Sequence, residues 1–251
     1  MRPGQVWEQG RDMQVELKNP WMMSLSRTGL LRFISHLDWL AMVERIFTRA
    51  ELPVVYSEGY HPRPIIKASP PLPTGVASLC ELLQIFFFAQ QDPKDAARKL
   101  ADALPEGVGL NWVQPMRFKP PKNPYKAIAA AEYSYDFREP LRADRKERLL
   151  SALMTLLCDS VRENASAFGP DMITMKPITG KLIEIKEQEK FLEGESNQVR
   201  LVGKMDSMET LHAAKLGLFL YEIVPLGRYP LITKLTHLRQ TPKGYEPVFA
   251  R

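Results

Sequence analysis

The stretch from Leu31 to Gly75 limits the possible folds more than any other part of this 251-residue chain. Ser35 stands where a helix N-cap is expected, and Asp38 follows three residues later, a capping-box pattern with Asp in the usual place of Glu. The helix is expected to end near Glu51, because the Leu-Pro pair that follows cannot continue it. Its apolar face recurs at steps of three and four: Trp39, Leu40, Val43, Ile46, Phe47 and Ala50.

Hydrophobic patterns around this helix predict the order β-α-β-β-α-β for the first half of the chain. A second helix is expected between Asp92, its N-cap, and Pro105, with Pro93 at its first position. The predicted strands are Trp21–Arg27, Ile65–Ser69, Cys80–Ala89 and Val108–Gln114. This order is that of the ferredoxin-like arrangement.

A proline-rich segment at residues 115–124, PMRFKPPKNP, predicts a stiff linker between two halves. The same element order follows it, with strands at Glu132–Phe137, Leu182–Phe191, Gln198–Met205 and Leu231–Leu238, and helices at Asp144–Val161 and from Asp206 or Ser207 to Tyr221. We therefore predict an α+β protein of two tandem ferredoxin-like halves, with antiparallel sheets and helices on one face. The predicted domains are residues 1–114 and residues 125–251.

Composition is that of an ordinary globular protein, with 45% hydrophobic and 25% charged residues. The net charge of +5 is compatible with a nucleic-acid partner but does not require one. The two cysteines, Cys80 and Cys158, lack paired spacing, which excludes a CxxC metal site or an iron–sulfur cluster bound by this chain alone. We expect a cytoplasmic protein of bacterial type without a membrane span, because no long apolar run or signal-peptide core is found.

Three motifs carry a resemblance to a known family: SHLD at residues 35–38, RAELPVVYSEGYHPRP at 49–64 and SPPLPTG at 69–75. Together they resemble the signature of the radical-SAM-associated family of unknown function, whose members occur alone or fused behind a radical-SAM enzyme. The resemblance implies a radical-SAM partner on a separate chain, since the three-cysteine motif of such an enzyme is absent from this sequence. It implies no particular activity.

The chain departs from the family pattern at two positions. Ala41 stands where the family commonly has Arg, three residues after the Asp of SHLD. His61 stands where Asn often precedes the proline of the glycine-containing turn. The second departure argues against an essential catalytic role for His61.

His36 and Asp38, at the expected helix start, are the candidate catalytic residues. His36 would act as a general acid or base, or would bind RNA, with Asp38 orienting it. The alternative is that Asp38 only caps the helix and His36 bonds a nearby loop. Residues two apart on a helix do not face each other, which weakens the idea of a pair.

The YSEGYHPRP loop offers an aromatic ring beside cationic groups, the combination that single-stranded RNA requires. The candidate RNA-binding residues are Arg32, Tyr60, His61, Arg63 and Lys67. The alternative is a structural turn in which Tyr60 anchors in the core and Arg63 is merely solvated. Loops are where binding residues concentrate, so both interpretations stay open.

We therefore predict an accessory or substrate-binding protein that works with a separate radical-SAM enzyme and binds RNA. One alternative is a metal-independent RNA-processing enzyme that uses His36. The other is a protein-docking scaffold without RNA affinity. No cofactor or metal is predicted, because the sequence has no phosphate-binding glycine motif and no histidine pair with metal-ligand spacing. The sequence does not decide the substrate or the oligomeric state.

Overall fold

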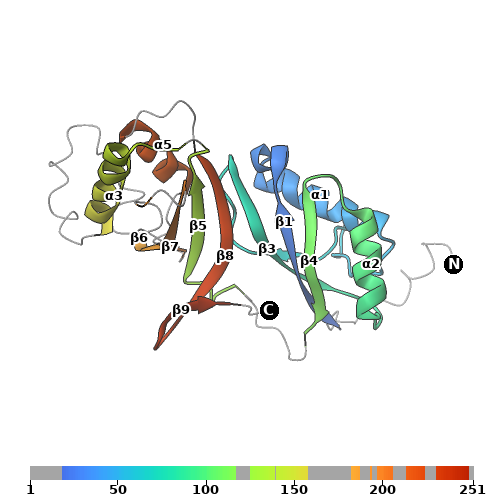
Figure 1. The fold of residues 1–251 in the computed structure, drawn as a ribbon. Helices are drawn as coiled ribbons and strands as arrows, with labels where there is room; N and C mark the ends of the chain where they lie inside the picture. The colour runs from blue at the N-terminus through green and yellow to red at the C-terminus, as the bar shows by residue number, and fades with distance from the viewer. Residues whose placement is uncertain are drawn as a thin grey trace.

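The computed structural model describes residues 19–116, 125–138, 140–157, 182–186, 193, 197–205, 213–223 and 230–248. These residues form a mixed α/β fold with one mostly antiparallel sheet and, within the described ranges, four α-helices. Helices lie on two opposite sides of the molecule, with the strands between them (Figure 1). None of the described helices is long and apolar enough to cross a membrane.

The first half contains every element that the sequence predicts. In chain order these are β1 (Pro20–Arg27), α1 (His36–Arg49), β2 (Lys67–Ala68), β3 (Val76–Phe86), α2 (Pro93–Ala103) and β4 (Val108–Pro115), with a 3-10 helix at Gly29–Phe33 before α1. The predicted cap of α1 is confirmed, since the Ser35 hydroxyl accepts the Asp38 N–H at 3.1 Å. The same hydroxyl donates to the Asp38 carboxylate at 2.7 Å.

The second half also follows the predicted order, and its described elements end in a hairpin that the prediction omitted. The elements are β5 (Ala130–Asp136), α3 (Ala143–Leu157), β6 (Leu182–Lys186), β7 (Gln198–Lys204), α5 (Ala213–Ile223), β8 (Leu231–Thr241) and β9 (Gly244–Pro247). Pro242 stands in the turn between β8 and β9 and was an available turn signal. The predicted cap at Asp206 or Ser207, and residues 158–161 and 187–191, lie outside the described residues.

The prediction gave antiparallel sheets to two halves, whereas the strands in the described part of the chain form one sheet that is mostly antiparallel. Its order is β4-β1-β3-β8-β5-β7-β6, with β2 on β3 and β9 on β8. The two halves meet where β3 and β8 pair in parallel over three residues of each strand, Val76–Ser78 and Ile232–Lys234. We call this short pairing the seam. The seam exists because β3 begins at Val76, upstream of the predicted start at Cys80.

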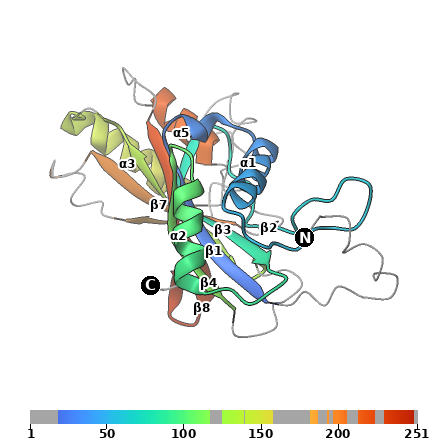
Figure 2. The ribbon, with the colours of Figure 1, turned by 90° about the vertical axis from the view of Figure 1, so that its right-hand side faces the viewer.

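Both faces of β1 are buried, although alternation alone predicts one buried face. Odd-numbered residues of β1 pack with α1 and α2, whereas Met22 joins the core of the second half. The first core includes Trp21, Met23, Leu25, Trp39, Val43, Ile46, Phe47, Leu83, Ile85, Ala96 and Leu100. Figures 1 and 2 show α1 and α2 beside β1 and β4, and α3 and α5 beside β5 and β7. The second half therefore covers the face of the first that its own helices leave free.

Candidate functional site

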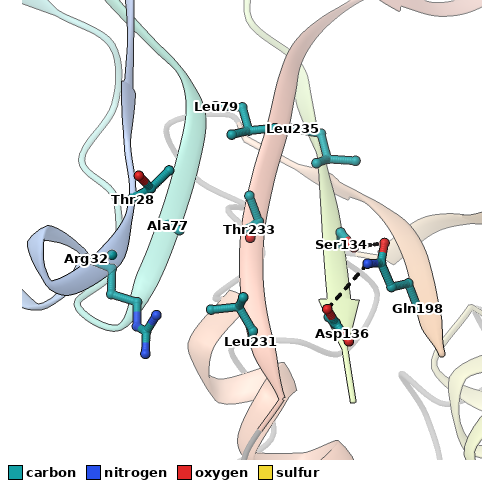
Figure 3. A pocket seen from close by; sticks show the side chains of 11 residues that line it. Thr28, Arg32, Ala77, Leu79, Ser134, Asp136, Gln198, Leu231, Thr233 and Leu235 are labelled. Atoms are coloured by element: carbon teal, nitrogen blue, oxygen red, sulfur yellow. Dashed lines mark hydrogen bonds between the residues drawn. The ribbon is translucent and has the colours of Figure 1, made fainter. Parts of the chain in front are cut away.

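A groove of about 330 Å³ opens over the seam and takes residues from both halves. Its lining residues are Thr28, Gly29, Arg32, Ala77, Leu79, Ser134, Asp136, Gln198, Leu231, Thr233 and Leu235. Figure 3 shows Arg32 on the first-half wall and Ser134, Gln198 and Asp136 on the opposite wall, with Thr233 and Leu231 of β8 between them. Of the predicted site residues, Arg32 is the one that lines this groove.

The second-half wall of the groove is held by a short hydrogen-bond network. The Ser134 hydroxyl donates to the Gln198 side-chain oxygen at 3.2 Å, and the Gln198 amide donates to the Asp136 carboxylate at 3.4 Å. The other Asp136 oxygen accepts the Arg138 N–H at 2.8 Å. The groove thus presents a guanidinium on one wall and a fixed carboxylate on the other, over an apolar floor, as polar ligand sites do.

Charged side chains are buried beside the seam, on the strands that join the halves. Glu81 on β3 and Lys234 on β8 approach to 2.6 Å, and their side chains are 3% and 0% exposed. The two groups form a buried ion pair between the strands of the seam. Arg27, at the end of β1, is 1% exposed and lies over the Trp39 ring, 5.5 Å from its centroid. We call Arg27, Glu81 and Lys234 the buried charge cluster.

His237 extends this cluster along β8 toward Cys80. Its Nε2 lies 3.2 Å from the Lys234 ammonium, and its Nδ1 lies 3.6 Å from the Cys80 sulfur. Burial, and then the Lys234 charge, lower the pKa of His237 well below its ordinary value. Burial likewise raises the pKa of the Cys80 thiol, so the pair lacks the thiolate that nucleophilic cysteine chemistry requires.

His36 and Asp38 face different surroundings. Asp38 is exposed and bound to Ser35, which supports the capping role over a catalytic one. His36 is half-buried, and the charges of Glu81, Arg27 and Lys234 act on it. Its pKa is lowered, chiefly by burial, which keeps the imidazole neutral at neutral pH. The charges that act on His36 are therefore those of the buried charge cluster.

The predicted loop residues stand apart from both features. Tyr60 is fully exposed, and His61 and Arg63 are exposed beside it. The base of the loop is fixed, because Ser57 and Arg63 exchange two hydrogen bonds, one of them through the Ser57 hydroxyl. Figure 2 shows this segment projecting from the body of the molecule. Tyr60 is not the core anchor that the alternative interpretation expected.

Lys67 lies on β2, away from the tip of the loop. It is half-buried, and its ammonium lies 5.6 Å from the Phe86 ring centroid. Its carbonyl accepts a hydrogen bond from the Tyr125 hydroxyl at 2.7 Å, which ties β2 to the start of the second half. These contacts give Lys67 a structural role that the phosphate-binding hypothesis did not include.

Sequence patterns missed Arg27, Glu81 and Lys234 as site residues. Only Glu81, between Cys80 and Leu82, has apolar sequence neighbours, and that context was the available signal, because buried charges are rare and need a partner or a task. Arg27 and Lys234 have Ser or Thr beside them and gave no such signal. Within the described part of the chain, no group of three or more His, Cys, Asp or Glu side chains is placed to hold a metal ion.

The fold and groove define an α/β protein with a ligand-sized depression over a mostly antiparallel sheet. Residues 21–211 match the model of DUF2344, described as an uncharacterized protein conserved in bacteria. The chain belongs to this family. A comparison with curated proteins gives no match. The family description names no activity or partner, so the radical-SAM partner is a prediction that rests on the motifs alone.

The buried charge cluster predicts an order of stability among variants. Glu81→Gln leaves Arg27 and Lys234 buried without their anion, so the free energy of unfolding should fall by about 3–5 kcal/mol. Lys234→Met removes the contact of Glu81, but the carboxylate keeps the attraction of the Arg27 charge, so the loss should be smaller, about 1–3 kcal/mol. Urea unfolding of the two variants measures both values. A smaller loss for Glu81→Gln than for Lys234→Met would contradict the cluster.

The lowered pKa of His237 predicts a loss of stability in acid. Below the ordinary histidine pKa of about 6.5, His237 binds a proton in the unfolded chain but not in the folded chain. The free energy of unfolding should therefore fall as pH drops from about 6.5, by up to about 1.4 kcal/mol per pH unit for this residue. His237→Gln should flatten that slope in urea unfolding at several pH values. An unchanged slope would show that the imidazole is not held neutral.

Proposed function

We propose that this protein is an accessory protein that binds single-stranded RNA through the Tyr60 loop and works beside a separate radical-SAM enzyme. The observation that carries the RNA part is the fully exposed Tyr60 ring on a loop whose base is held by hydrogen bonds. The exposed side chains of His61 and Arg63 lie on the same loop. The enzyme partner is carried over from the resemblance of the SHLD and YSEGYHPRP motifs.

An aromatic side chain exposed at a loop tip is available to a partner. Tyr60 exposes its whole ring to water, whereas tyrosines in this chain such as Tyr133 and Tyr135 are buried. Nucleobases stack on such rings whatever their sequence, and each stacked base contributes about 1–3 kcal/mol. Arg63 follows three residues later on the same loop, where its guanidinium is free to reach a phosphate.

The loop is suited to binding because its base is rigid while its tip is not packed. Gly59 has a φ of +128°, which lets the chain reverse before Tyr60. Tyr56 and Pro64 form a bridge below the tip, and the Ile65 N–H donates to the Val55 carbonyl. A loop already held in shape loses less entropy on binding than a free one.

We also infer that each half is a ferredoxin-like unit. Within the halves, strand pairing gives the orders β4-β1-β3-β2 and β8-β5-β7-β6, all antiparallel. In this interpretation the fold is a repeat of one unit, and the groove and the Tyr60 loop lie on different parts of its surface. Fold alone does not assign function, so the proposal rests on the loop.

A second candidate, an RNA-processing enzyme, is favoured by one observation. His36 has a lowered pKa beside a buried charge cluster, and a neutral imidazole is the form that accepts a proton as a general base. Such perturbed groups occur at catalytic sites but also in structural ion-pair networks.

Fluorescence anisotropy with labelled single-stranded RNA over a salt series tests the proposal. Tyr60→Ala should weaken binding about tenfold, which corresponds to about 1.4 kcal/mol of stacking. Arg63→Ala should weaken it across all sequences and reduce the slope of log K against log salt by about one. Arg148→Ala, an exposed arginine on α3, is the matched control and should bind as the wild type. Equal effects of the Arg63 and Arg148 substitutions would show that the binding depends on net charge alone and would contradict the proposal.

Incubation of labelled RNA with the purified protein in chelator separates the two candidates. The proposed binding role predicts that the RNA stays intact, since the described residues offer His36 no paired acid. Cleavage that is lost in His36→Ala and kept in His61→Ala would replace the binding role with the enzymatic one. Co-purification with a radical-SAM enzyme, without RNA affinity, would instead favour the protein-docking scaffold.

A further inference from the structure

Arg27 is buried with hydrogen-bond donors that no described residue accepts. Its side chain is 1% exposed, and both Nε and Nη2 are without a hydrogen-bond partner in the described part of the chain. The guanidinium stays charged at any pH at which a protein folds. A buried charged donor without an acceptor costs several kcal/mol, so its presence asks for an explanation.

The open donors of Arg27 are the two on one edge of the guanidinium. Nε–H and one Nη2–H point in the same direction from the planar group, so together they form a fork. A carboxylate or phosphate fits this fork with two parallel hydrogen bonds. The Glu81 carboxylate does not occupy it, because that group makes its close contact with Lys234, at 2.6 Å.

A third open donor belongs to the ring that Arg27 covers. The Trp39 indole N–H is also buried without a hydrogen-bond partner among the described residues, in a side chain that is 0% exposed. The Arg27 guanidinium lies over this indole, 5.5 Å from the ring centroid. The fork and the indole N–H therefore belong to adjoining groups on β1 and α1.

The charge balance of the surroundings favours an anion. The buried charge cluster has two cations, Arg27 and Lys234, and one anion, Glu81. His36 is three residues before Trp39 on α1, on the same side of the helix, and the charges of the cluster act on it. His36 is the first residue of this 14-residue helix, so it lies at the positive end of the helix dipole, which the exposed Asp38 carboxylate of the same turn offsets in part.

We propose that Arg27, Trp39 and the start of α1 form a binding site for one oxyanion group of a small ligand, a carboxylate or a phosphate. The fork of Arg27 takes two oxygens of the group, and the Trp39 N–H supplies a further donor. His36, at the helix start, is half-buried and so is more exposed than Arg27 and Trp39. The site is separate from the Tyr60 loop, and it does not depend on RNA binding.

Thermal unfolding of the full chain in phosphate, sulfate, acetate and chloride, at equal ionic strength, tests this site. An oxyanion that binds the folded chain raises the melting temperature in a saturable way, while chloride at the same ionic strength does not. A larger effect of phosphate or sulfate points to a phosphate ligand, and a larger effect of acetate points to a carboxylate; both outcomes support the site. No oxyanion effect beyond chloride would overturn it.

Two conservative variants locate the effect. Arg27→Lys keeps the charge but removes the fork, and should weaken oxyanion binding at least about tenfold. Trp39→Phe keeps an aromatic ring but removes the N–H, and should weaken it by a smaller factor. Arg98→Lys, at an exposed position on α2, should keep wild-type binding. If Arg27→Lys does not fold, Trp39→Phe decides, measured by calorimetric titration of the same oxyanion. Wild-type affinity in the variants would overturn the proposal.

Discussion

The contact between Glu81 and Lys234 joins two halves that share little else along their sheet. The seam has only three residue pairs, and a parallel pairing that short contributes few hydrogen bonds. Glu81 and Lys234 are buried 2.6 Å apart at its end, so either charge would be uncompensated in a low-dielectric interior if the other were removed. Three features depend on this contact between the halves: the groove over the seam, the packing of the second half on the free face of β1, and the charges around His36.

Local signals predicted the elements, and long-range pairing decided what they formed. The Ser35 cap, the Pro93 start of α2 and the apolar face of α1 follow from residues close in sequence, and all are present. The parallel seam joins strands from opposite halves, and no local pattern encodes it. β9 was missed for a different reason, since its turn signal at Pro242 was present but not used.

The candidate site divides in the same way. Tyr60 and Arg63 could be predicted as surface residues because glycine and proline mark an exposed turn. His36 could be singled out by its place at a helix start, but the charges that act on it come from β1, β3 and β8. Sequence adjacency suggested Asp38 instead, and that residue serves the cap. Arg27 and Glu81 look like ordinary strand residues until the fold shows that water does not reach them.

The seam also constrains the order in which the molecule folds during its synthesis. On the ribosome, β1 to β4 emerge first and can pair among themselves, whereas β8 follows only after β5, β6 and β7. Until β8 is made, Glu81 lacks its partner Lys234, and the edge of β3 that pairs with β8 is unpaired. Premature contact with another nascent chain would meet an unpaired carboxylate at that edge, and inward-pointing charge is a known deterrent to edge-to-edge pairing. Glu81 thus disfavours wrong pairing at this edge before β8 is made, and forms an ion pair with Lys234 afterwards.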